Sequence, residues 1–257
     1  MMDQRHKADA FAALHIKGDP LVLYNIWDAG SARCVAAAGA KALATGSWSV
    51  AAAQGFADGQ EMPLLQLVDI ARSIVAVTEL PVTIDFEGGF AEEPEDVAVN
   101  AARIIDIGAV GINFEDQVLG GSGVHPLAKQ AARIRAIREM ADQRGMPLFI
   151  NARTDLFLQE NDPQRYADLY DQVVERANAF AEAGASGFFV PGLADAPLIE
   201  RLCAEVALPV NIMMRPGAPS LDELAALGVS RISYGPIPYR EMIRRLGAEA
   251  QAIYRCG

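Results

Sequence analysis

Two carboxylates follow one short, strand-like segment of the chain. In the stretch VTIDFEGGF, residues 82–90, apolar and β-branched residues lead to Asp85 and Glu87, and two glycines follow at once. Side chains two positions apart on a strand share a face, so we expect both carboxylates to point into the same space. Burying one unpaired carboxylate is costly, and burying two costs more. The stretch therefore predicts that a positive group lies close to this pair.

The positive group is either a metal ion or an arginine. Glu115 lies at the end of the apolar segment AVGINFE, and Arg153 lies at the end of PLFINAR. On neighbouring strands, three carboxylates would therefore converge beside one guanidinium. With no histidine or cysteine among them, Asp85, Glu87 and Glu115 indicate an oxygen-donor site for Mg²⁺ or Mn²⁺. The alternative is that these acids pair with Arg153 or cap the following helices, with no metal.

The segments that carry these residues alternate with helix-like stretches along the chain. Eight short segments rich in Val, Ile or Phe recur, and nearly all end on Gly or Pro. Between most of them lie stretches such as PEDVAVNAARIIDIGA, with apolar residues at helical spacing. Strands that alternate with helices predict parallel strands with right-handed crossovers. We therefore expect residues 1–257 to form one α/β domain, a (β/α)8 TIM-type barrel.

A doubly wound open sheet is the structural alternative. It ranks lower because no G-x-G-x-x-G follows the first strand and eight units are many for one open sheet. In a barrel, the functional residues lie at the carboxyl ends of the strands, which is where the polar residues of these segments gather. The N-terminal segment KADAFAALHIK predicts an amphipathic helix that plugs the opposite end of the barrel.

Composition limits the possible partners. The formal net charge is −11 and no basic block stands out, which argues against nucleic acid or an anionic membrane surface. The three cysteines are widely separated and lack any C-x-x-C spacing, which argues against a disulfide framework or a zinc–thiolate site. Such cysteine usage is typical of proteins in a reducing compartment. No signal peptide and no bilayer-spanning apolar run is recognisable, so we predict a cytoplasmic protein.

Nearly the whole chain resembles the isocitrate lyase/phosphoenolpyruvate mutase superfamily, in particular its phosphoenolpyruvate phosphomutase-like members. The resemblance rests on the ordered motifs NIWDAGSAR, TGSWSVAAAQGFADG, IDFEGGF, NFEDQV, INARTD and ISYGP. It implies a barrel that assembles into a homo-oligomer, usually a tetramer, often with the last helix exchanged between subunits. It also implies Mg²⁺-dependent chemistry in which the metal stabilises the enolate of a 2-oxo acid.

The resemblance gives each matching residue an implied role. Asp85 matches the direct Mg²⁺ ligand, and Glu87 and Glu115 match acids that act through metal-bound water. Asp58 matches an acid near the substrate. The positions that match substrate-binding residues are Gly46, Ser47, Trp48, Arg153 and Asn211. Trp48 could instead merely fill the barrel mouth.

The loop after the fourth strand departs from the superfamily pattern. It reads EDQVLGGSGVHPLAK and lacks both the K-K-C-G-H type sequence of the lyases and the K-T-N-S pattern of the phosphomutases. The sixth strand ends FFVPGL, without the glutamate of many lyases. The glycine-rich loop is a candidate lid, and His125 is its candidate acid–base group, the alternative being a loop histidine with no catalytic role.

The first functional prediction is a Mg²⁺-dependent carbon–carbon lyase, of the carboxy-lyase or oxo-acid-lyase type, for a small 2-oxo acid or dicarboxylate. Such cleavage needs the least machinery beyond the metal and Arg153. One alternative is C–P bond chemistry on phosphonopyruvate or phosphoenolpyruvate. The other is a non-catalytic 2-oxo-acid-binding protein that keeps the metal site and converts nothing.

Overall fold

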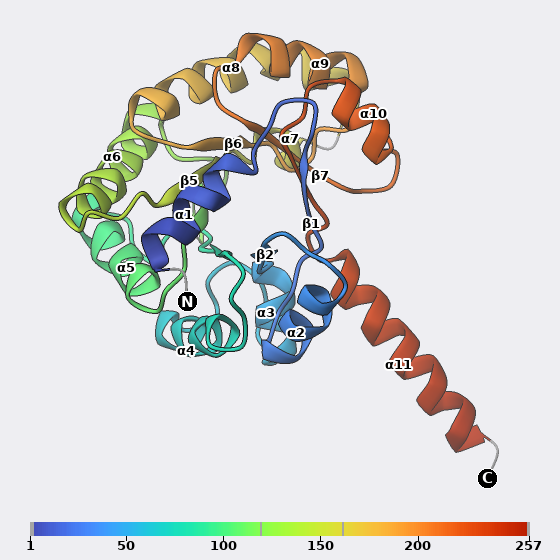
Figure 1. The fold of residues 1–257 in the computed structure, drawn as a ribbon. Helices are drawn as coiled ribbons and strands as arrows, with labels where there is room; N and C mark the ends of the chain where they lie inside the picture. The colour runs from blue at the N-terminus through green and yellow to red at the C-terminus, as the bar shows by residue number, and fades with distance from the viewer. Residues whose placement is uncertain (1–2, 119, 161, 256–257) are drawn as a thin grey trace.

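Eight parallel strands form the centre of the molecule, as the alternation of segments predicts (Figure 1). The computed structural model describes residues 3–118, 120–160 and 162–255. The strands are β1 (Leu21–Leu23), β2 (Leu43–Ala44), β3 (Val82–Asp85), β4 (Gly111–Glu115), β5 (Phe149–Arg153), β6 (Gly187–Phe189), β7 (Val210–Met213) and β8 (Arg231–Ser233). Their spatial order is β1-β8-β7-β6-β5-β4-β3-β2, and a parallel bridge between Ile26 and Thr45 joins the two ends of this order. The (β/α)8 barrel is therefore confirmed.

Helices surround the strands. They are α1 (Gln4–Ala13), α2 (Ala29–Ala37), α3 (Ser47–Ala53), α4 (Leu64–Val75), α5 (Pro94–Asp106), α6 (Leu127–Gln143), α7 (Leu156–Gln159), α8 (Tyr166–Glu182), α9 (Ala196–Glu205), α10 (Leu221–Ala226) and α11 (Ile237–Arg255), with one 3₁₀ turn, η1 (Pro163–Arg165). No helix in the described ranges combines the length and the apolar character that a bilayer crossing requires.

Local sequence signals set the limits of these elements, and α5 shows how. Pro94 occupies the first turn, and Glu95 and Asp96 place negative charge at the positive end of the helix dipole. Ile104 is fully buried against the barrel on the apolar face. Gly108, just past the helix, has a φ of +95°, which ends the helix at low steric cost. The next strand, β4, is buried along its whole length, as expected for a parallel strand covered on both faces.

Helix α1 closes the amino-terminal end of the barrel, as predicted. The Phe11 ring is fully buried and meets the Phe149 ring edge-on, with 5.3 Å between their centroids. A Cβ atom on Gly111 would lie 3.0 Å from Thr83 Oγ1, 3.1 Å from the Phe149 carbonyl oxygen and 3.2 Å from Phe11, so glycine at the start of β4 lets the ring pack closely. With this end filled by side chains, the accessible space lies at the carboxyl ends of the strands.

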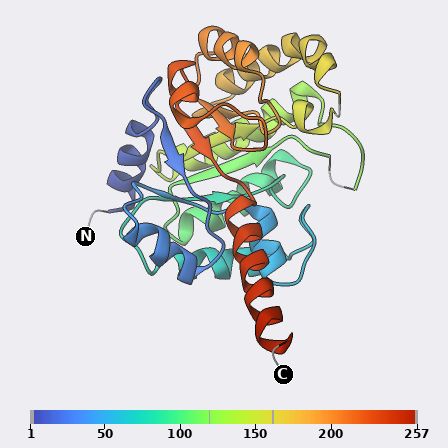
Figure 2. The same cartoon turned by 90° about the vertical axis from the view of Figure 1, so that its right-hand side faces the viewer.

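Helix α11 departs from the ring of helices. In both views it extends away from the barrel, and its C-terminal part lies far from the strands (Figures 1 and 2). Its outer half exposes large apolar side chains, including Leu246 at 60% and Ile253 at 72%. Only its first turn, near Pro238, is buried against the barrel.

Candidate functional site

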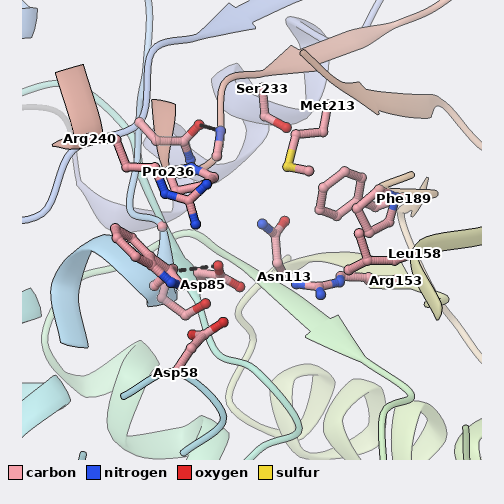
Figure 3. Close-up of a pocket in the computed structure, with 16 residues that line it drawn as sticks. Asp58, Asp85, Asn113, Arg153, Leu158, Phe189, Met213, Ser233, Pro236 and Arg240 are labelled. Atoms are coloured by element: carbon pink, nitrogen blue, oxygen red, sulfur yellow. Dashed lines mark hydrogen bonds between the residues drawn. The ribbon is translucent and has the colours of Figure 1, made fainter. Parts of the chain in front are cut away.

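A cavity of about 270 Å³ opens at the carboxyl ends of the strands, and we call it the barrel-mouth cavity (Figure 3). It is lined by Asn25, Gly46, Ser47, Trp48, Asp58, Asp85, Asn113, Arg153, Leu158, Phe189, Pro191, Met213, Ser233, Gly235, Pro236 and Arg240. Asn25 joins the loops that surround it: its side chain donates to the Thr45 carbonyl and accepts from the backbone N–H groups of Tyr234 and Gly235.

Asp85, the last residue of β3, is the most constrained carboxylate of the cavity. Its Oδ2 accepts the backbone N–H of Ser47 at 2.8 Å, and its own N–H donates to Thr45 Oγ1 at 2.8 Å. These two bonds join β3 to the segment between β2 and α3. Its other oxygen, Oδ1, is buried without a hydrogen-bond partner among the described residues. A buried carboxylate oxygen left unsatisfied is costly, so this atom marks the position where a cation would stabilise the site.

Asp58 and Glu87 lie beside Asp85, but they do so in different ways. Glu87 accepts the backbone N–H groups of Gly59 and Gln60 at 3.1 and 2.7 Å, and it thereby fixes the loop that presents Asp58 to the cavity. Burial raises the pKa of Glu87 from 4.5 to about 7, and the charges of Asp85 and Asp58 act in the same direction. Burial and Asp85 also raise the pKa of Asp58. Three carboxyl groups therefore crowd one place and repel one another.

Glu115 is paired with Arg153, its cross-strand neighbour on β5. Glu115 Oε2 lies 2.8 Å from Arg153 Nη1, while Asp155 accepts from Nε and Nη2 of the same guanidinium at 2.5 and 2.8 Å. Burial raises the pKa of Glu115 well above its ordinary value, and Arg153 opposes this shift. The hypothesis that the acids pair with Arg153 thus accounts for Glu115, but it leaves Asp85 Oδ1 without a partner among the described residues.

The donor set fits a magnesium ion with few direct protein ligands. Within the described ranges, no three His, Cys, Asp or Glu residues are spaced to ligate one metal directly. Mg²⁺ retains several waters and is often held by only one or two carboxylates, so this spacing is compatible with it. Asp85 Oδ1 would be the direct ligand, and Glu87 would act through metal-bound water.

The turn after β3, residues 86–91, is held in an unusual backbone conformation. Glu87 and Phe90 have φ angles of +50° and +56°, which are uncommon for residues other than glycine. Arg133 of α6 is fully buried and donates to two carbonyls of this turn, and Asn100 of α5 donates to two others. Strained backbone of this kind persists only where the surroundings over-determine it, and here it directs Glu87 toward Asp58 and Asp85.

Replacing Arg133 by methionine should lower the free energy of unfolding by about 2 kcal/mol, because buried carbonyls lose their donor. It should also weaken Mg²⁺ binding, since Glu87 depends on the turn. Arg138→Met, in the same helix, is the control: Arg138 also donates to two carbonyls, of Leu148 and Gly184, in partly buried hydrogen bonds at the amino-terminal end of the barrel, far from the cavity. Urea unfolding with and without Mg²⁺ measures both effects. An equal Mg²⁺ response in the two variants would contradict the positioning role of Arg133.

Below the cavity, amide side chains form a network inside the barrel. Asn151 donates to Asn113 at 2.8 Å and to Asn211 at 3.0 Å, and buried Arg231 donates to the same oxygen of Asn113. Asn113 therefore has its oxygen occupied, and it lines the cavity. Asn211 is fully buried, is absent from the lining and donates to Ser233. Asn211 therefore lies beneath the cavity and does not line it. It supports Asn113 indirectly, because it accepts a hydrogen bond from Asn151, which also donates to Asn113.

The structure does not bring His125 to the cavity. Its side chain is buried on the far side of the β4 loop, where Nε2 lies 4.0 Å from Glu92, and its backbone holds Asp116 and Arg176. Burial and the nearby Arg133 lower the pKa of this histidine. The described part of the candidate lid, which excludes Leu119, forms a hairpin closed by an antiparallel bridge between Gln117 and Val124. An acid–base role for His125 would require this hairpin to rearrange.

The segment from Gly46 to Trp48 borders the cavity, as the resemblance implies. Its amides are partly in use: the Gly46 N–H donates to Ile26, and the Ser47 N–H to Asp85. Trp48 is half-buried, and its ring contacts Arg240 and Tyr239 of α11. The indole therefore forms one side of the cavity.

Arg240, Leu158, Phe189 and Met213 line the cavity although we did not predict them as site residues. A usable signal existed for Arg240, because it follows β8 within the first turn of a helix, where βα loops supply functional residues. The three apolar residues carry no such signal, since apolar residues at strand ends are common.

Comparisons with known proteins agree with this architecture. The family model described as phosphoenolpyruvate phosphomutase matches residues 11–254. An uncharacterised Mycobacterium tuberculosis protein is 32% identical, with 95% of this chain and 88% of that protein covered. The 2-methylisocitrate lyase of Escherichia coli is 29% identical over 91% of this chain and 80% of the lyase. A Burkholderia cenocepacia crystal structure, provisionally named a phosphonomutase, is 47% identical with a TM-score of 0.94, and the match covers 97% and 99% of the two chains.

Proposed function

The chain belongs to the phosphoenolpyruvate phosphomutase family, and from this premise we propose that it is a Mg²⁺-dependent carbon–carbon lyase for a small 2-oxo acid or dicarboxylate. Named relatives in this family are lyases and mutases. The observation that carries the proposal is the unpartnered Oδ1 of Asp85, which lies in a cavity that also contains Arg153. Mg²⁺ bound there would act as a Lewis acid that polarises the substrate's keto group.

The residues around Asp85 have separable tasks in this proposal. Asp85 holds the cation, and Glu87 keeps the Asp58 loop in place through the N–H groups of Gly59 and Gln60. Arg153, fixed by Glu115 and Asp155 at the cavity surface, would bind the substrate's carboxylate with a preorganised guanidinium. Asp58 is a carboxyl with a raised pKa at the cavity surface, which suits a group that exchanges a proton with the substrate.

C–P bond chemistry is the second candidate, because the 47% identical structure is provisionally named a phosphonomutase. A phosphonate dianion requires several cations, and two cationic side chains close to the lid loop in sequence, Lys129 and Arg133, are already engaged. Lys129 lies 2.6 Å from Glu92, and Arg133 is buried against the turn after β3. Arg240, which also lines the cavity, is the cation that these contacts leave for a substrate, and one guanidinium suits a carboxylate better than a phosphonate dianion. The binding-protein alternative differs from both because it would convert nothing.

Turnover in Mg²⁺ and in EDTA tests the proposal. Oxaloacetate, alkyl-malates, 2-methylisocitrate and phosphonopyruvate form the panel, with products identified directly. We expect cleavage of a carboxylate member, and we expect excess EDTA to reduce it at least about a hundredfold. Release of phosphate from phosphonopyruvate would favour the second candidate. Binding of 2-oxo acids with Mg²⁺ but no turnover of any compound would favour the binding protein.

We also propose that the chain forms a homo-oligomer through α11. The helix extends from the barrel, and its apolar residues Leu246 and Ile253 are exposed in one copy of the chain. A second copy that covers them would remove this surface from water. Sedimentation velocity will test this assembly, and a monomer at micromolar concentration would contradict it.

A further inference from the structure

Asn113 lies on the floor of the barrel-mouth cavity. It is the cross-strand neighbour of Asp85, and Figure 3 shows its side chain between Asp85 and Arg153. The side-chain amide of an asparagine has an oxygen that accepts hydrogen bonds and a nitrogen that donates them. Its orientation therefore decides which kind of ligand atom it can meet in the cavity. The groups beneath Asn113 determine that orientation.

Arg231 of β8 fixes the amide from below. It is fully buried, and its Nη2 lies 3.0 Å from Asn113 Oδ1. A guanidinium can only donate, so the atom of Asn113 that faces it must be the oxygen. Burial lowers the pKa of Arg231 to about 9, which leaves the guanidinium positively charged at neutral pH. A buried cation thus holds the Asn113 oxygen toward the barrel interior.

A chain of amides requires the same orientation. Asn211 Nδ2 donates to the backbone carbonyls of Ile212 and Arg231, which can only accept. Asn211 must therefore accept through its Oδ1, and it does so from Asn151 Nδ2 at 3.0 Å. The same nitrogen of Asn151 donates to Asn113 Oδ1 at 2.8 Å. Two separate contacts therefore direct the Asn113 oxygen inward and its nitrogen toward the cavity.

The Nδ2 group of Asn113 has no acceptor in the described part of the chain. Even its neighbour Asp85 keeps an unpartnered Oδ1. The floor of the cavity therefore presents an N–H donor whose direction is set before any ligand arrives. Such a donor stabilises a negatively charged oxygen without having to reorganise.

We propose that Asn113 is a catalytic residue, whose Nδ2 donates to the keto oxygen of the substrate, and that Arg231 is the positioning residue that fixes it. The inference rests on the proposed function. When the bond between C3 and the leaving fragment breaks, its electron pair forms the C2–C3 double bond, and the fragment departs without that pair, as carbon dioxide does. The electrons of the keto double bond move onto oxygen, which becomes the enolate oxygen. A fixed donor binds this charged oxygen more tightly than the neutral ketone.

Oxalate and pyruvate in the presence of Mg²⁺ test the role of Asn113 by titration calorimetry. Both offer a carboxylate beside a further oxygen, which is charged in oxalate, as in the enolate, and neutral in pyruvate. We expect Asn113→Ala to weaken oxalate binding at least about tenfold and pyruvate binding less than about threefold. Asn113→Asp, which presents only acceptors to the cavity, should weaken oxalate binding further. Asn178→Ala, which removes an exposed amide on α8, should bind both ligands as the wild type does.

A double-mutant cycle tests the positioning role of Arg231. Lysine also only donates, so Arg231→Lys should bind oxalate within about threefold of the wild type. Glutamine can donate or accept, so Arg231→Gln permits the Asn113 amide to flip and should bind oxalate at least about fivefold more weakly. In the Asn113→Ala background the same change should have an effect below about twofold, because Arg231 acts through Asn113. An undiminished effect there would show that Arg231 acts by its charge alone and would overturn the positioning role.

The outcomes separate the inference from the proposed function. Circular dichroism verifies that each variant is folded, and Asn113→Asp retains both acceptor contacts beneath the cavity if the alanine variant does not fold. Oxalate binding that survives in Asn113→Asp, or equal losses of oxalate and pyruvate in Asn113→Ala, would overturn the inference and leave the proposed function intact. If oxalate fails to bind the wild type with Mg²⁺, the proposed function is wrong and the inference falls with it.

Discussion

Asp85→Asn should reduce turnover at least about a thousandfold at saturating Mg²⁺. Asparagine keeps the shape of the side chain and can still accept the Ser47 N–H, but it removes the negative charge that would hold the cation. Loss of one preorganised electrostatic contact typically costs two to three orders of magnitude in rate, and here the metal would be lost with it. Steady-state kinetics on the best substrate of the panel measures the effect. Asp69→Asn, an exposed acid on α4, should leave the rate unchanged.

The same substitution should leave the metal-free protein about as stable as the wild type. The charge of Asp85 raises the pKa of both Asp58 and Glu87, so the three groups repel one another in the folded state. Removing that charge relieves this repulsion, but it also removes the attraction of Asp85 for the buried Arg153 and Arg231, so the free energy of unfolding in EDTA should change by no more than about 1 kcal/mol. A loss of activity without a loss of stability assigns Asp85 to the function of the site. Retained turnover in a folded Asp85→Asn protein would contradict the assignment of Asp85 as the metal ligand.

The metal-free protein should lose stability as the pH rises from 4.5 through 7. Glu87 has a pKa of about 7 in the folded state against 4.5 ordinarily, so between these values the folded state binds the additional proton. Its contribution is fully present below pH 4.5 and is lost as the pH rises through 7, about 3 kcal/mol in all. Urea unfolding in EDTA at pH 5 and pH 8 measures this loss. Mg²⁺ should restore stability mainly at pH 8, where the carboxylates are charged.

Glu87→Gln isolates this contribution from the other buried acids. Glutamine cannot ionise, so the variant should lose less stability than the wild type between pH 5 and pH 8. The pKa values of Asp58, Glu115 and Asp116 are also raised, that of Asp116 to about 6, and all three groups remain in the variant. The charge of Glu87 is the smallest of the causes that raise the pKa of Glu115, so the difference between the two proteins belongs mainly to Glu87. Parallel pH profiles for the two proteins would show that Glu87 is not the titrating group.

The barrel could be predicted from the sequence because its signals are local and repeated. Each strand is short and apolar, and Gly108 follows its helix with a φ of +95°, a conformation that glycine adopts at low steric cost. Asp85 and Glu87 lie close together, as predicted, but not because they share one face of a strand. β3 ends at Asp85 and Glu87 has a positive φ, so strand alternation does not apply to it. The Glu87 carboxylate nevertheless lies near Asp85, as predicted, because the turn that Arg133 holds directs the side chain toward it.

Residues placed by packing between distant elements could not be predicted. The place of Arg240 just after β8 marks it as a candidate, but its side chain reaches the cavity because α11 begins beside Trp48, and no local pattern gives the angle of that helix. His125 has the right chemistry for an acid–base group, yet the hairpin between β4 and α6 places its ring near Glu92, away from the cavity. Sequence spacing indicates which residues share a strand, whereas loop conformation decides where a side chain points.

Binding of Mn²⁺, as a paramagnetic substitute for Mg²⁺, tests the central claim most directly because it requires no knowledge of the substrate. Electron paramagnetic resonance follows the loss of the free Mn²⁺ signal as protein and oxalate are added. We predict that the wild type removes the signal, that excess Mg²⁺ restores it by competition, and that Asp85→Asn leaves it unchanged. Equal Mn²⁺ binding by the wild type and Asp85→Asn would place the metal elsewhere. If neither binds Mn²⁺, the carboxylate cluster is structural, and the proposed chemistry fails with it.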